Sequence, residues 1–301
     1  MTEPTPSEIR TVLVTGASTG FGRLTVETLA RRGHRVFAGL RDVSGRNAPA
    51  AAELTALAAA EHLDLKVLEI DVTDDASVAT AVRTLIETAG QLDVVVNNAG
   101  RNFAGPLEAY TAHEAQQQFD VNTLGALRVN NAVLPHLRAQ GHGVLIQVGS
   151  LSAWMTPPFN GLYAASKAAL RALTEAWHHE LAPYGVESVI IEPASYPTNI
   201  GANAALPADQ ERLGLYSEAL TGFVTDLTRR ATENAESIGT ASQVSDALTS
   251  LVETAPGKRP LQTLVAPSAQ LAAVQEVHRK AAQATRIVAD DMGIGAYLAL
   301  R

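Results

Sequence analysis

The amino-acid sequence predicts an α/β fold in which one doubly wound parallel sheet of about seven strands carries helices on both faces. Short runs rich in Val, Ile and Leu alternate along the chain with longer stretches of helical spacing. The runs are almost continuously apolar, as in strands that are buried on both faces of a sheet. No linker-like stretch divides the 301 residues, and a single α/β domain commonly reaches about 250 residues or more.

Seven apolar runs predict the strands, and helical spacing predicts the segments between them. The strands are Arg10–Thr15, Arg35–Leu40, Leu65–Ile70, Asp93–Val96, Gly143–Val148, Val186–Ile191 and Leu261–Val265. The helices are Gly22–Arg32, Ala50–Glu61, Ala76–Ala89, Ala115–Ala139, Leu162–Leu181 and Ala241–Glu253. Gly33 suits the end of the first helix, and Pro135 should kink or end the fourth near its last turn.

These elements form one domain, residues 10–267, with additions at three places. Residues 1–9 are polar, contain two prolines, and are expected to be a disordered tail without a signal peptide. Residues 194–238 have helical spacing but few strand-like runs, which predicts a helical insertion over the ligand site. Residues 268–301 predict a helical C-terminal extension. No stretch approaches the about 18 apolar residues of a membrane span.

Composition and charge exclude several classes of protein. Apolar residues make up 46% of the chain and charged residues 18%, an ordinary balance for a domain with a buried core. The formal charge of −8 has no runs of like charge, so we expect no nucleic-acid partner. The absence of cysteine excludes disulfides and thiolate metal sites and fits the cytoplasmic location that we expect. His178 and His179 are adjacent and the other histidines lack ligand spacing, so we expect no metal.

A glycine-rich turn, Thr15-Gly-Ala-Ser-Thr-Gly-Phe-Gly22, follows the first predicted strand and opens the first helix. Its glycines permit a tight turn, a close approach to a pyrophosphate and close packing of helix against strand. The helix N-terminus adds unpaired amides and a positive dipole end. Glycines also mark ordinary helix starts, but the strand, turn and helix together favour a dinucleotide site. The residues expected to hold the cofactor here are Gly16, Ser18, Thr19, Gly20, Phe21 and Gly22.

Two motifs in register make the chain resemble the short-chain dehydrogenase/reductase family. One is the glycine-rich turn, and the other is Asn97-Asn-Ala-Gly100 after the fourth predicted strand. The resemblance is strong over residues 9–200 and looks most like the 17β-hydroxysteroid-dehydrogenase-like and retinol-dehydrogenase-like group. It implies a Rossmann-type fold and a nicotinamide cofactor. The further cofactor contacts that it implies are Asp71, Val72, Asn98, Ala99, Gly100, Tyr163, Lys167, Pro193 and Thr198. Asp71 could equally be only a helix cap.

The end of the second predicted strand favours NADP(H) over NAD(H). Enzymes that prefer NAD usually place a carboxylate here, which binds the ribose hydroxyls and repels a 2′-phosphate. Leu40 occupies that position, and Arg41 next to it can offer a charged guanidinium fork to a phosphate. The alternative is that Arg41 is a solvated loop residue paired with Asp42.

Tyr163 and Lys167 stand four residues apart on a predicted helix, so their side chains share one face. A nearby ammonium and the positive nicotinamide ring would lower the pKa of the phenol, which could then act as general acid and base. The alternative is a packed tyrosine beside a surface lysine. Ser150, at the end of the fifth predicted strand, has the spacing to Tyr163 that the family shows between its catalytic serine and tyrosine. Ser152 competes for this role but fits the spacing less well.

The resemblance adds Asn122 as a catalytic residue that interrupts a helix and holds a water in line with Lys167. Its alternative is an internal amide satisfied by the backbone. After the sixth predicted strand, Ala194 replaces the glycine that the family usually has, so the loop beside the nicotinamide should be shaped differently. The residues expected to line an apolar substrate pocket are Ser152, Trp154, Phe159 and Tyr196. The large apolar side chains among them could equally be core or subunit-contact residues.

The sequence thus predicts an NADP(H)-dependent oxidoreductase, with NAD(H) as the alternative cofactor. It would transfer a hydride between nicotinamide and a carbonyl or secondary alcohol, as a ketoreductase does, on a largely apolar substrate. A non-catalytic NADP(H)-binding regulatory protein on the same fold stays open. A sugar-nucleotide epimerase or dehydratase is disfavoured by the glycine spacing and by the lack of a sizeable C-terminal sugar domain. Relatives pair through their long helices, so the resemblance implies a homodimer or homotetramer.

Overall fold

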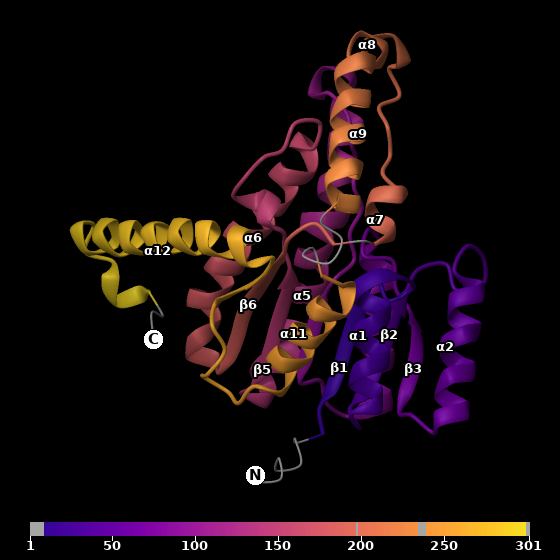
Figure 1. The fold of residues 1–301 in the computed structure, drawn as a ribbon. Helices are drawn as coiled ribbons and strands as arrows, with labels where there is room; N and C mark the ends of the chain where they lie inside the picture. The colour runs from indigo at the N-terminus through magenta and orange to yellow at the C-terminus, as the bar shows by residue number, and fades with distance from the viewer. Residues whose placement is uncertain (1–8, 197, 234–238, 299–301) are drawn as a thin grey trace.

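The computed structural model describes residues 9–196, 198–233 and 239–298. Seven parallel strands form one sheet in the order β3-β2-β1-β4-β5-β6-β7, which confirms the predicted fold class (Figure 1). The strands are β1 Thr11–Thr15, β2 Arg35–Leu40, β3 Leu65–Glu69, β4 Val94–Asn97, β5 Gly143–Val148, β6 Val186–Pro193 and β7 Gln262–Val265. The direction of strand addition reverses between β1 and β4, where such sheets bind ligands beyond the carboxyl ends of the strands.

Strand β6 is longer than the sequence predicts. It continues past Ile191, because Glu192 pairs with Leu264 and Pro193 pairs with Val265 in β7. The side chain of Glu192 is therefore carried into the protein interior, where it is 0% exposed.

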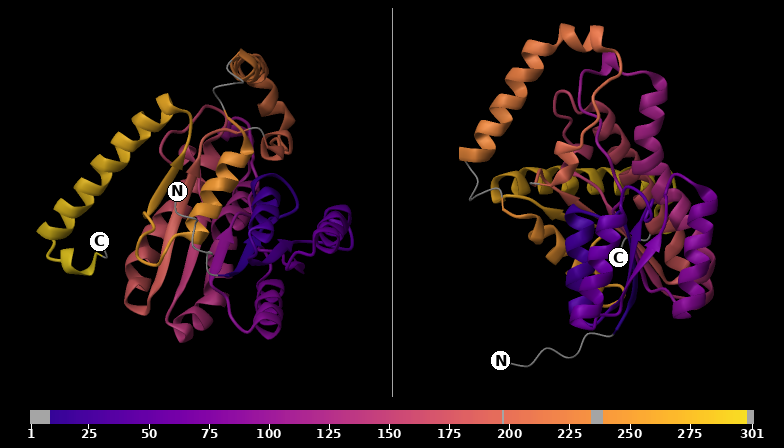
Figure 2. Two further views of the ribbon diagram at one scale, coloured as in Figure 1. Left: turned by 60° about the horizontal axis from the view of Figure 1, so that its bottom comes forward. Right: turned by 90° about the vertical axis from the view of Figure 1, so that its right-hand side faces the viewer.

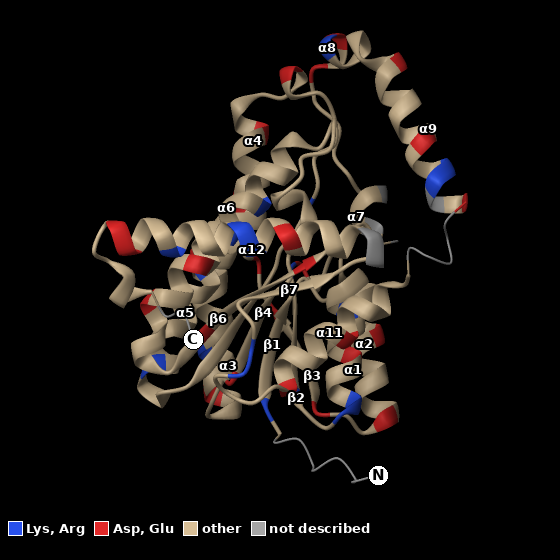
Figure 3. Ribbon diagram, turned by 60° about the vertical axis from the view of Figure 1, so that its left-hand side comes forward, with Lys and Arg blue, Asp and Glu red and all other residues tan. Residues whose placement is uncertain are grey.

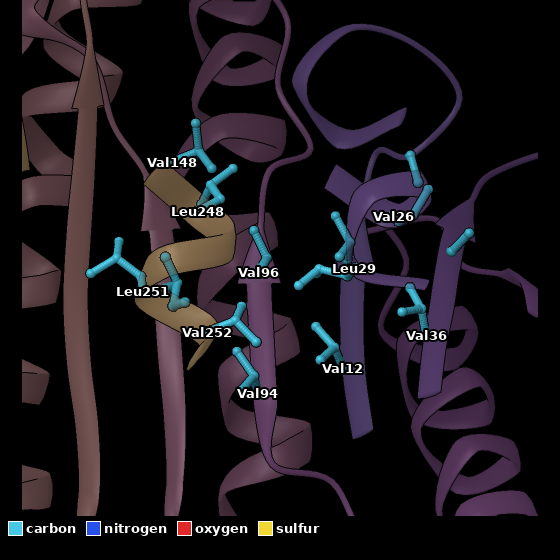
Figure 4. Packing of buried hydrophobic residues seen from close by; sticks show 14 of the residues in the cluster. Val12, Val26, Leu29, Val36, Val94, Val96, Val148, Leu248, Leu251 and Val252 are labelled. Atoms are coloured by element: carbon cyan, nitrogen blue, oxygen red, sulfur yellow. The ribbon is translucent and has the colours of Figure 1, made fainter. Parts of the chain in front are cut away.

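Helices cover both faces of the sheet. One face carries α1 Gly20–Arg31, α2 Ala48–Glu61 and α11 Ala241–Glu253. The other carries α3 Asp75–Ala89, α5 Gly125–Gln140 and α6 Gly161–Leu181. Leu248 and Val252 of α11 lie over strand residues such as Val94 and Val96, all of them 0% exposed (Figure 4). The central strands β1, β4 and β5 are buried along their whole length between the two helical layers, which explains their nearly continuous hydrophobic runs.

The predicted single helix Ala115–Ala139 is wrong. The chain forms α4 Ala112–Phe119, a π-helical turn η2 Asp120–Leu124, and then α5. Pro135 does not end α5, which continues to Gln140. Val133 and Leu137, both 0% exposed, pack on the sheet on either side of the proline, so tertiary burial compensates for the helix hydrogen bond that proline cannot make.

Helices follow β6 and β7 where the insertion and the C-terminal extension are predicted. They are α7 Asn199–Ala202, α8 Gln210–Leu215, α9 Ser217–Glu233 and α12 Ser268–Asp291. Helices α8 and α9 stand off beyond one end of the sheet, and α12 extends sideways from it (Figures 1 and 2). Most of the expected N-terminal tail lies outside the described residues. In the described part of the chain, no helix is both long and apolar enough to cross a membrane. Charges of both signs are interspersed over the ribbon (Figure 3).

Candidate active site

The glycine-rich turn between β1 and α1 has the backbone shape that its sequence requires. Gly16 and Gly20 have φ angles of 68° and 59°, which favour glycine. A Cβ on Gly22 would lie 2.4 Å from Nδ2 of Asn98 and 2.5 Å from the carbonyl oxygen of Gly16. A side chain at Gly22 would therefore push the turn away from the loop that follows β4.

Hydrogen bonds join this turn to the Asn97–Gly100 loop. Nδ2 of Asn98 donates to the carbonyl oxygens of Thr15 and Gly16 at 2.9 and 3.0 Å. The amides of Asn98 and Ala99 donate to the Thr15 hydroxyl, each at 3.1 Å. The side chain of Asn98 thus holds the two loops together, and a direct contact between this residue and the cofactor stays a prediction.

The first turn of α1 fits the pyrophosphate of a dinucleotide. Thr19 precedes this helix and, among the described residues, its side chain makes no capping hydrogen bond, so the amides of the first turn stay available to an anion. Thr198 lies beside the same turn, since a Cβ on Gly20 would be 3.8 Å from the Cβ of Thr198. The absence of side chains at Gly16, Gly20 and Gly22 leaves a space beside the first turn of α1 that Cβ atoms would occupy, and we call this space the phosphate cradle. Ser18 and Phe21 belong to the same turn.

Arg41 follows β2 at the same edge of the sheet. Its neighbour Asp42 accepts a hydrogen bond from the amide of Arg46 at 2.8 Å, and no salt bridge joins Arg41 to a carboxylate of the described residues. The pairing of Arg41 with Asp42 is therefore absent.

The pKa of Asp71 is lowered. Burial would raise this pKa, but two hydrogen bonds from Thr73 and the charges of Arg41 and Arg128 outweigh the effect of burial.

Asp71 and Val72 follow β3, and both have structural contacts. Oδ1 of Asp71 accepts from the amide and the hydroxyl of Thr73 at 2.9 and 2.7 Å. The helix α3 is capped by Asp74 instead, whose carboxylate accepts from the amides of Ala76 and Ser77. Val72 is 8% exposed and packs in the core. The contact of both residues with an adenine stays a prediction.

Ser150 and Tyr163 meet beyond the carboxyl end of β5. Ser150 follows this strand by two residues, and Tyr163 lies in the first turn of α6. The Ser150 hydroxyl lies close enough to the Tyr163 phenol to influence its pKa, and it accepts from the amide of Ser152 at 3.1 Å. The structure therefore brings together the residues that the sequence places on a strand end and on a helix.

Lys167 completes this group from the next turn of α6. Its side chain is buried, its Nζ donates to the carbonyl oxygen of Val148 at 2.7 Å, and Nζ lies 5.8 Å from the centre of the Tyr163 ring. Burial lowers the pKa of Lys167 to about 8. A surface lysine, the alternative that the sequence left open, is excluded.

Two effects act on the pKa of Tyr163 in the protein alone. Burial raises it, and the neighbouring Ser150 hydroxyl, which acts in the opposite direction, does not compensate. The expected lowering depends on the positive nicotinamide ring as well as on Lys167 and stays a prediction. The phenol is thus a proton donor in the protein alone.

Asn122 lies in the π-helical turn and is 1% exposed. Its Nδ2 donates to the Arg101 carbonyl at 3.0 Å and to the Ser166 hydroxyl at 3.1 Å, and its Oδ1 accepts from the Arg101 amide at 2.9 Å. Both amide hydrogens are used, as in the internal amide of the alternative reading. A Cβ on Gly100 would lie 3.5 Å from Oδ1 of Asn122 and 3.8 Å from Nζ of Lys167, so these groups are neighbours. The water-holding role stays a prediction.

The predicted pocket residues have different surroundings. The indole of Trp154 donates to Oε1 of buried Glu192 at 2.9 Å. The ring of Tyr196 is buried against Phe21 with centroids 6.2 Å apart. The Phe159 ring meets Phe223 of α9 at 5.6 Å. Ser152 is partly exposed.

The structure adds Glu192 and Arg101, which sequence reasoning missed. Pro193, a predicted cofactor contact, ends β6, and the amide of the following Ala194 donates to the Val265 carbonyl at 2.8 Å. Glu192 beside them is a carboxylate that directly follows the apolar run Val189–Ile191, which was the available signal. Arg101 follows the Asn97–Gly100 loop, and its guanidinium lies 4.2 Å from the centre of the Phe103 ring. Among the described residues, no cluster of side chains could hold a metal ion.

The glycine-rich turn, which fits a pyrophosphate, lies at the same edge of the parallel sheet as the group formed by Ser150, Tyr163 and Lys167. This arrangement serves dehydrogenases and reductases that use NAD or NADP, and comparisons with known proteins support this class. Residues 10–209 match the sequence profile of short chain dehydrogenases, and the chain belongs to that family.

Relatives and solved structures agree. A 3-ketodihydrosphingosine reductase of Bacteroides thetaiotaomicron is 33% identical over 193 residues, which cover 64% of this chain and 66% of that protein. Human 17-beta-hydroxysteroid dehydrogenase type 1 is 39% identical over 186 residues, 60% of this chain and 55% of that protein. The chain thus spans just under two thirds of the first relative and about half of the second.

Two crystal structures match over more of the chain. A short-chain dehydrogenase from Streptomyces avermitilis has a TM-score of 0.74 and 28% identity, covering 96% of this chain and 99% of that one. A short chain dehydrogenase/reductase from Burkholderia phymatum in complex with NAD has a TM-score of 0.72 and 26% identity, covering 93% and 96%. The complex of the second structure with NAD supports a nicotinamide cofactor.

Proposed function

We propose that the chain is an NADP(H)-dependent ketoreductase that moves a hydride between nicotinamide and the carbonyl carbon of a largely apolar substrate. Tyr163 is the general acid and base, Ser150 orients the substrate oxygen, and Lys167 supplies the neighbouring charge. The observation that carries this proposal is the meeting of the Ser150 and Tyr163 hydroxyls beside the buried ammonium of Lys167.

The residues of the chain suit the proton step of a reduction. When bound, the nicotinamide supplies the hydride. Tyr163 donates its proton to the substrate oxygen, and its raised pKa keeps that proton on the phenol until it is needed. Ser150 donates a hydrogen bond to the same oxygen and stabilises its developing negative charge. Lys167 then stabilises the phenolate that remains.

The charges near Arg41 support NADP(H). Burial lowers the pKa of Arg101, and the positive charges of Arg41 and Arg46 lower it further, so three guanidinium groups act on one another at this edge. No salt bridge joins any of the three to a carboxylate of the described residues. An anion such as a 2′-phosphate would relieve this repulsion.

Apolar side chains near the site support an apolar substrate. Met155, between Ser150 and Tyr163, is 60% exposed. Leu215, Val224 and Leu227 of α8 and α9 are more than half exposed as well. Helix α9 is linked to the segment after Ser150 by the contact of Phe223 with Phe159, and exposed apolar groups of this kind are typical of a binding surface for an apolar ligand. The named relatives act on a ketosphingoid base and on steroids according to their names, which fits this class.

A fluorescence titration with NADPH and with NADH, followed by turnover on a panel of apolar ketones, tests the proposal. We expect tighter binding of NADPH and oxidation of NADPH with at least one ketone. Cofactor binding without turnover would support the regulatory alternative. Turnover confined to sugar nucleotides would support an epimerase or dehydratase.

A further inference from the structure

A second buried polar cluster lies beside the candidate active site, and the proposed proton transfer does not use it. Its centre is Glu192 near the end of β6, whose side chain is 0% exposed. Trp154 donates to Oε1 of this carboxyl group at 2.9 Å, and Nε2 of His278 lies 3.2 Å from Oε2. Three segments that are distant in the sequence therefore meet on one carboxyl group.

Aromatic contacts reinforce the cluster. The rings of Trp154 and His278 lie 4.2 Å apart with an angle of 41° between their planes. The guanidinium of Arg171 also lies 4.2 Å from the Trp154 ring and is paired with Glu175. The Trp154 side chain thus has a hydrogen bond at its edge and contacts with two further side chains.

Three titratable or charged side chains face Glu192. His278 comes from α12, and Arg171 and Glu175 come from α6. Burial raises the pKa of Glu192 to about 7, against the hydrogen bond from Trp154 and the charge of Arg171, while Glu175 raises it as well. Burial and then the charge of Arg171 lower the pKa of His278 to about 4. Near neutral pH, the contact is therefore between a largely neutral imidazole and a carboxyl group that readily holds a proton.

His278 attaches the C-terminal helix to this cluster. Helix α12 extends sideways from the sheet (Figures 1 and 2), and much of it is exposed to solvent. The His278 side chain, in contrast, is only 11% exposed. Residues 10–209 are those that match the family profile, so α12 lies beyond that match.

Each partner of His278 is close to a residue of the proposed mechanism. Trp154 comes four residues after Ser150, in the segment that joins Ser150 to Tyr163. Glu192 precedes Pro193, and its Cγ would lie 3.2 Å from a Cβ on Gly149, the residue before Ser150. A change at His278 can therefore reach Ser150 through two routes, the Trp154 segment and the packing of Glu192 on Gly149.

We propose that His278 is a positioning residue, which fixes the segment 151–160, and with it Ser150, by its close contact with Glu192 and its packing on Trp154. This inference rests on the proposed function, because it assigns the residue to the same reaction. Without the imidazole, water reaches Glu192 and one contact of the indole is lost. A small displacement of a group that orients the substrate is enough to slow the reaction.

Three substitutions at position 278 separate the packing on Trp154 from the polar contact with Glu192. His278→Ala removes both, His278→Phe keeps a ring against Trp154, and His278→Gln keeps an amide that can face Glu192. We expect kcat for an apolar ketone to fall about tenfold in His278→Ala and His278→Phe and to recover to within about threefold in His278→Gln. The Kd for NADPH should stay within about twofold in all three, because the glycine-rich turn lies on the other side of β4 and β5.

The matched control is Arg279→Ala on the same helix. Arg279 is exposed and pairs only with Glu276 of α12 among the described residues, so this variant should behave as the wild type. A folding defect of α12 as a whole would instead slow all four variants, including His278→Gln, and would overturn the proposal.

Trp154 fluorescence provides a readout that does not need turnover. In a Trp177→Phe background, Trp154 is the sole tryptophan, since the chain has two. His278→Ala should shift its emission to longer wavelength as water reaches the indole, and His278→Gln should shift it less. A red shift with unchanged kcat would show that the contact exists but does not position the site, which overturns the proposal. An unchanged emission would refute the contact.

The proposed function can fail separately. If the wild type reduces no ketone although the red shift is present in His278→Ala, the proposed function is refuted, and the positioning role is refuted with it.

Discussion

The ammonium of Lys167 donates a hydrogen bond of 2.7 Å to the main-chain carbonyl of Val148, two residues before Ser150. This bond ties the α6 helix to the end of β5, so one contact sets the separation between the residues that carry Ser150 and Tyr163. It also places a positive charge in the interior without a carboxylate partner among the described residues. The proposed chemistry and a measurable pH effect both follow from this arrangement.

Lys167 should make stability depend on pH in the alkaline range. Burial lowers its pKa from the usual 10.5 to about 8. Below pH 8 the folded and unfolded chains both carry the proton. Above pH 8 the folded protein has lost it while the unfolded chain keeps it up to about pH 10.5, so the free energy of unfolding rises with pH.

The measurement is urea unfolding of wild type and Lys167→Met at pH 7 and pH 9.5. The wild type should gain up to about 2 kcal/mol relative to the variant between these values. The difference between the two proteins cancels the titration of other groups. Parallel pH dependences would show that Lys167 keeps an ordinary pKa.

Ser150 and Ser152 should differ in their effect on the reaction. We expect Ser150→Ala to lower kcat by a factor of about 10² to 10³, because the substrate oxygen loses a hydrogen-bond donor in the transition state. Ser152→Ala is the matched control and should lower kcat less than about threefold, since only the Ser152 amide bonds Ser150. Steady-state turnover with saturating NADPH measures both. Equal losses would mean that Ser152 also takes part.

Gly22 should be essential for cofactor binding. In Gly22→Ala, the new Cβ would overlap Asn98 and the Gly16 carbonyl, so the turn and the neighbouring loop must separate. We expect the Kd for NADPH to rise more than about tenfold, as for the loss of one or more charge-assisted hydrogen bonds. Gly222→Ala in α9, where a Cβ meets nothing within 4 Å, should leave this Kd unchanged. Fluorescence titration tests both, and wild-type binding by Gly22→Ala would contradict the cradle.

Arg41 should determine the preference between the two cofactors. We expect Arg41→Ser to raise the Kd for NADPH by a factor of about 10 to 100 and to leave the Kd for NADH within about twofold, because only NADPH carries the 2′-phosphate. Arg35→Ser, at the opposite end of β2, removes a charge that is paired with Asp64 and is the control. If both cofactors weaken equally in Arg41→Ser, the arginine supports the loop rather than the phosphate.

The strands could be predicted from sequence because burial on both faces leaves a direct trace in the residues. The meeting of Ser150, Tyr163 and Lys167 was also within reach, since strand order and helix periodicity bring a strand end and a helix face to one edge. The π-helical turn could not be predicted from the hydrophobic spacing, which continues that of the flanking helices; only the resemblance, which implies that Asn122 interrupts a helix, pointed to this place. The turn is held by bonds of Asn122 to Arg101 and Ser166, which are distant in sequence.

Other features depend on the three-dimensional surroundings. The raised pKa of Tyr163 reflects burial, which no motif reports. Trp154 was expected to line the substrate pocket on the basis of its position after Ser150, but the partner of its indole nitrogen is Glu192, and His278 in α12 lies against its ring. The sequence contains a hint only in the carboxylate of Glu192, which directly follows the apolar run Val189–Ile191.

The phenol of Tyr163 is central to the account, and Tyr163→Phe tests it most directly. Phenylalanine keeps the ring and its packing and removes only the hydroxyl. The account predicts that NADPH binds this variant within about threefold of the wild-type Kd while kcat for a ketone falls by a factor of about 10² or more. Turnover near the wild-type rate, with cofactor bound in both proteins, would contradict the assignment of Tyr163 as the general acid.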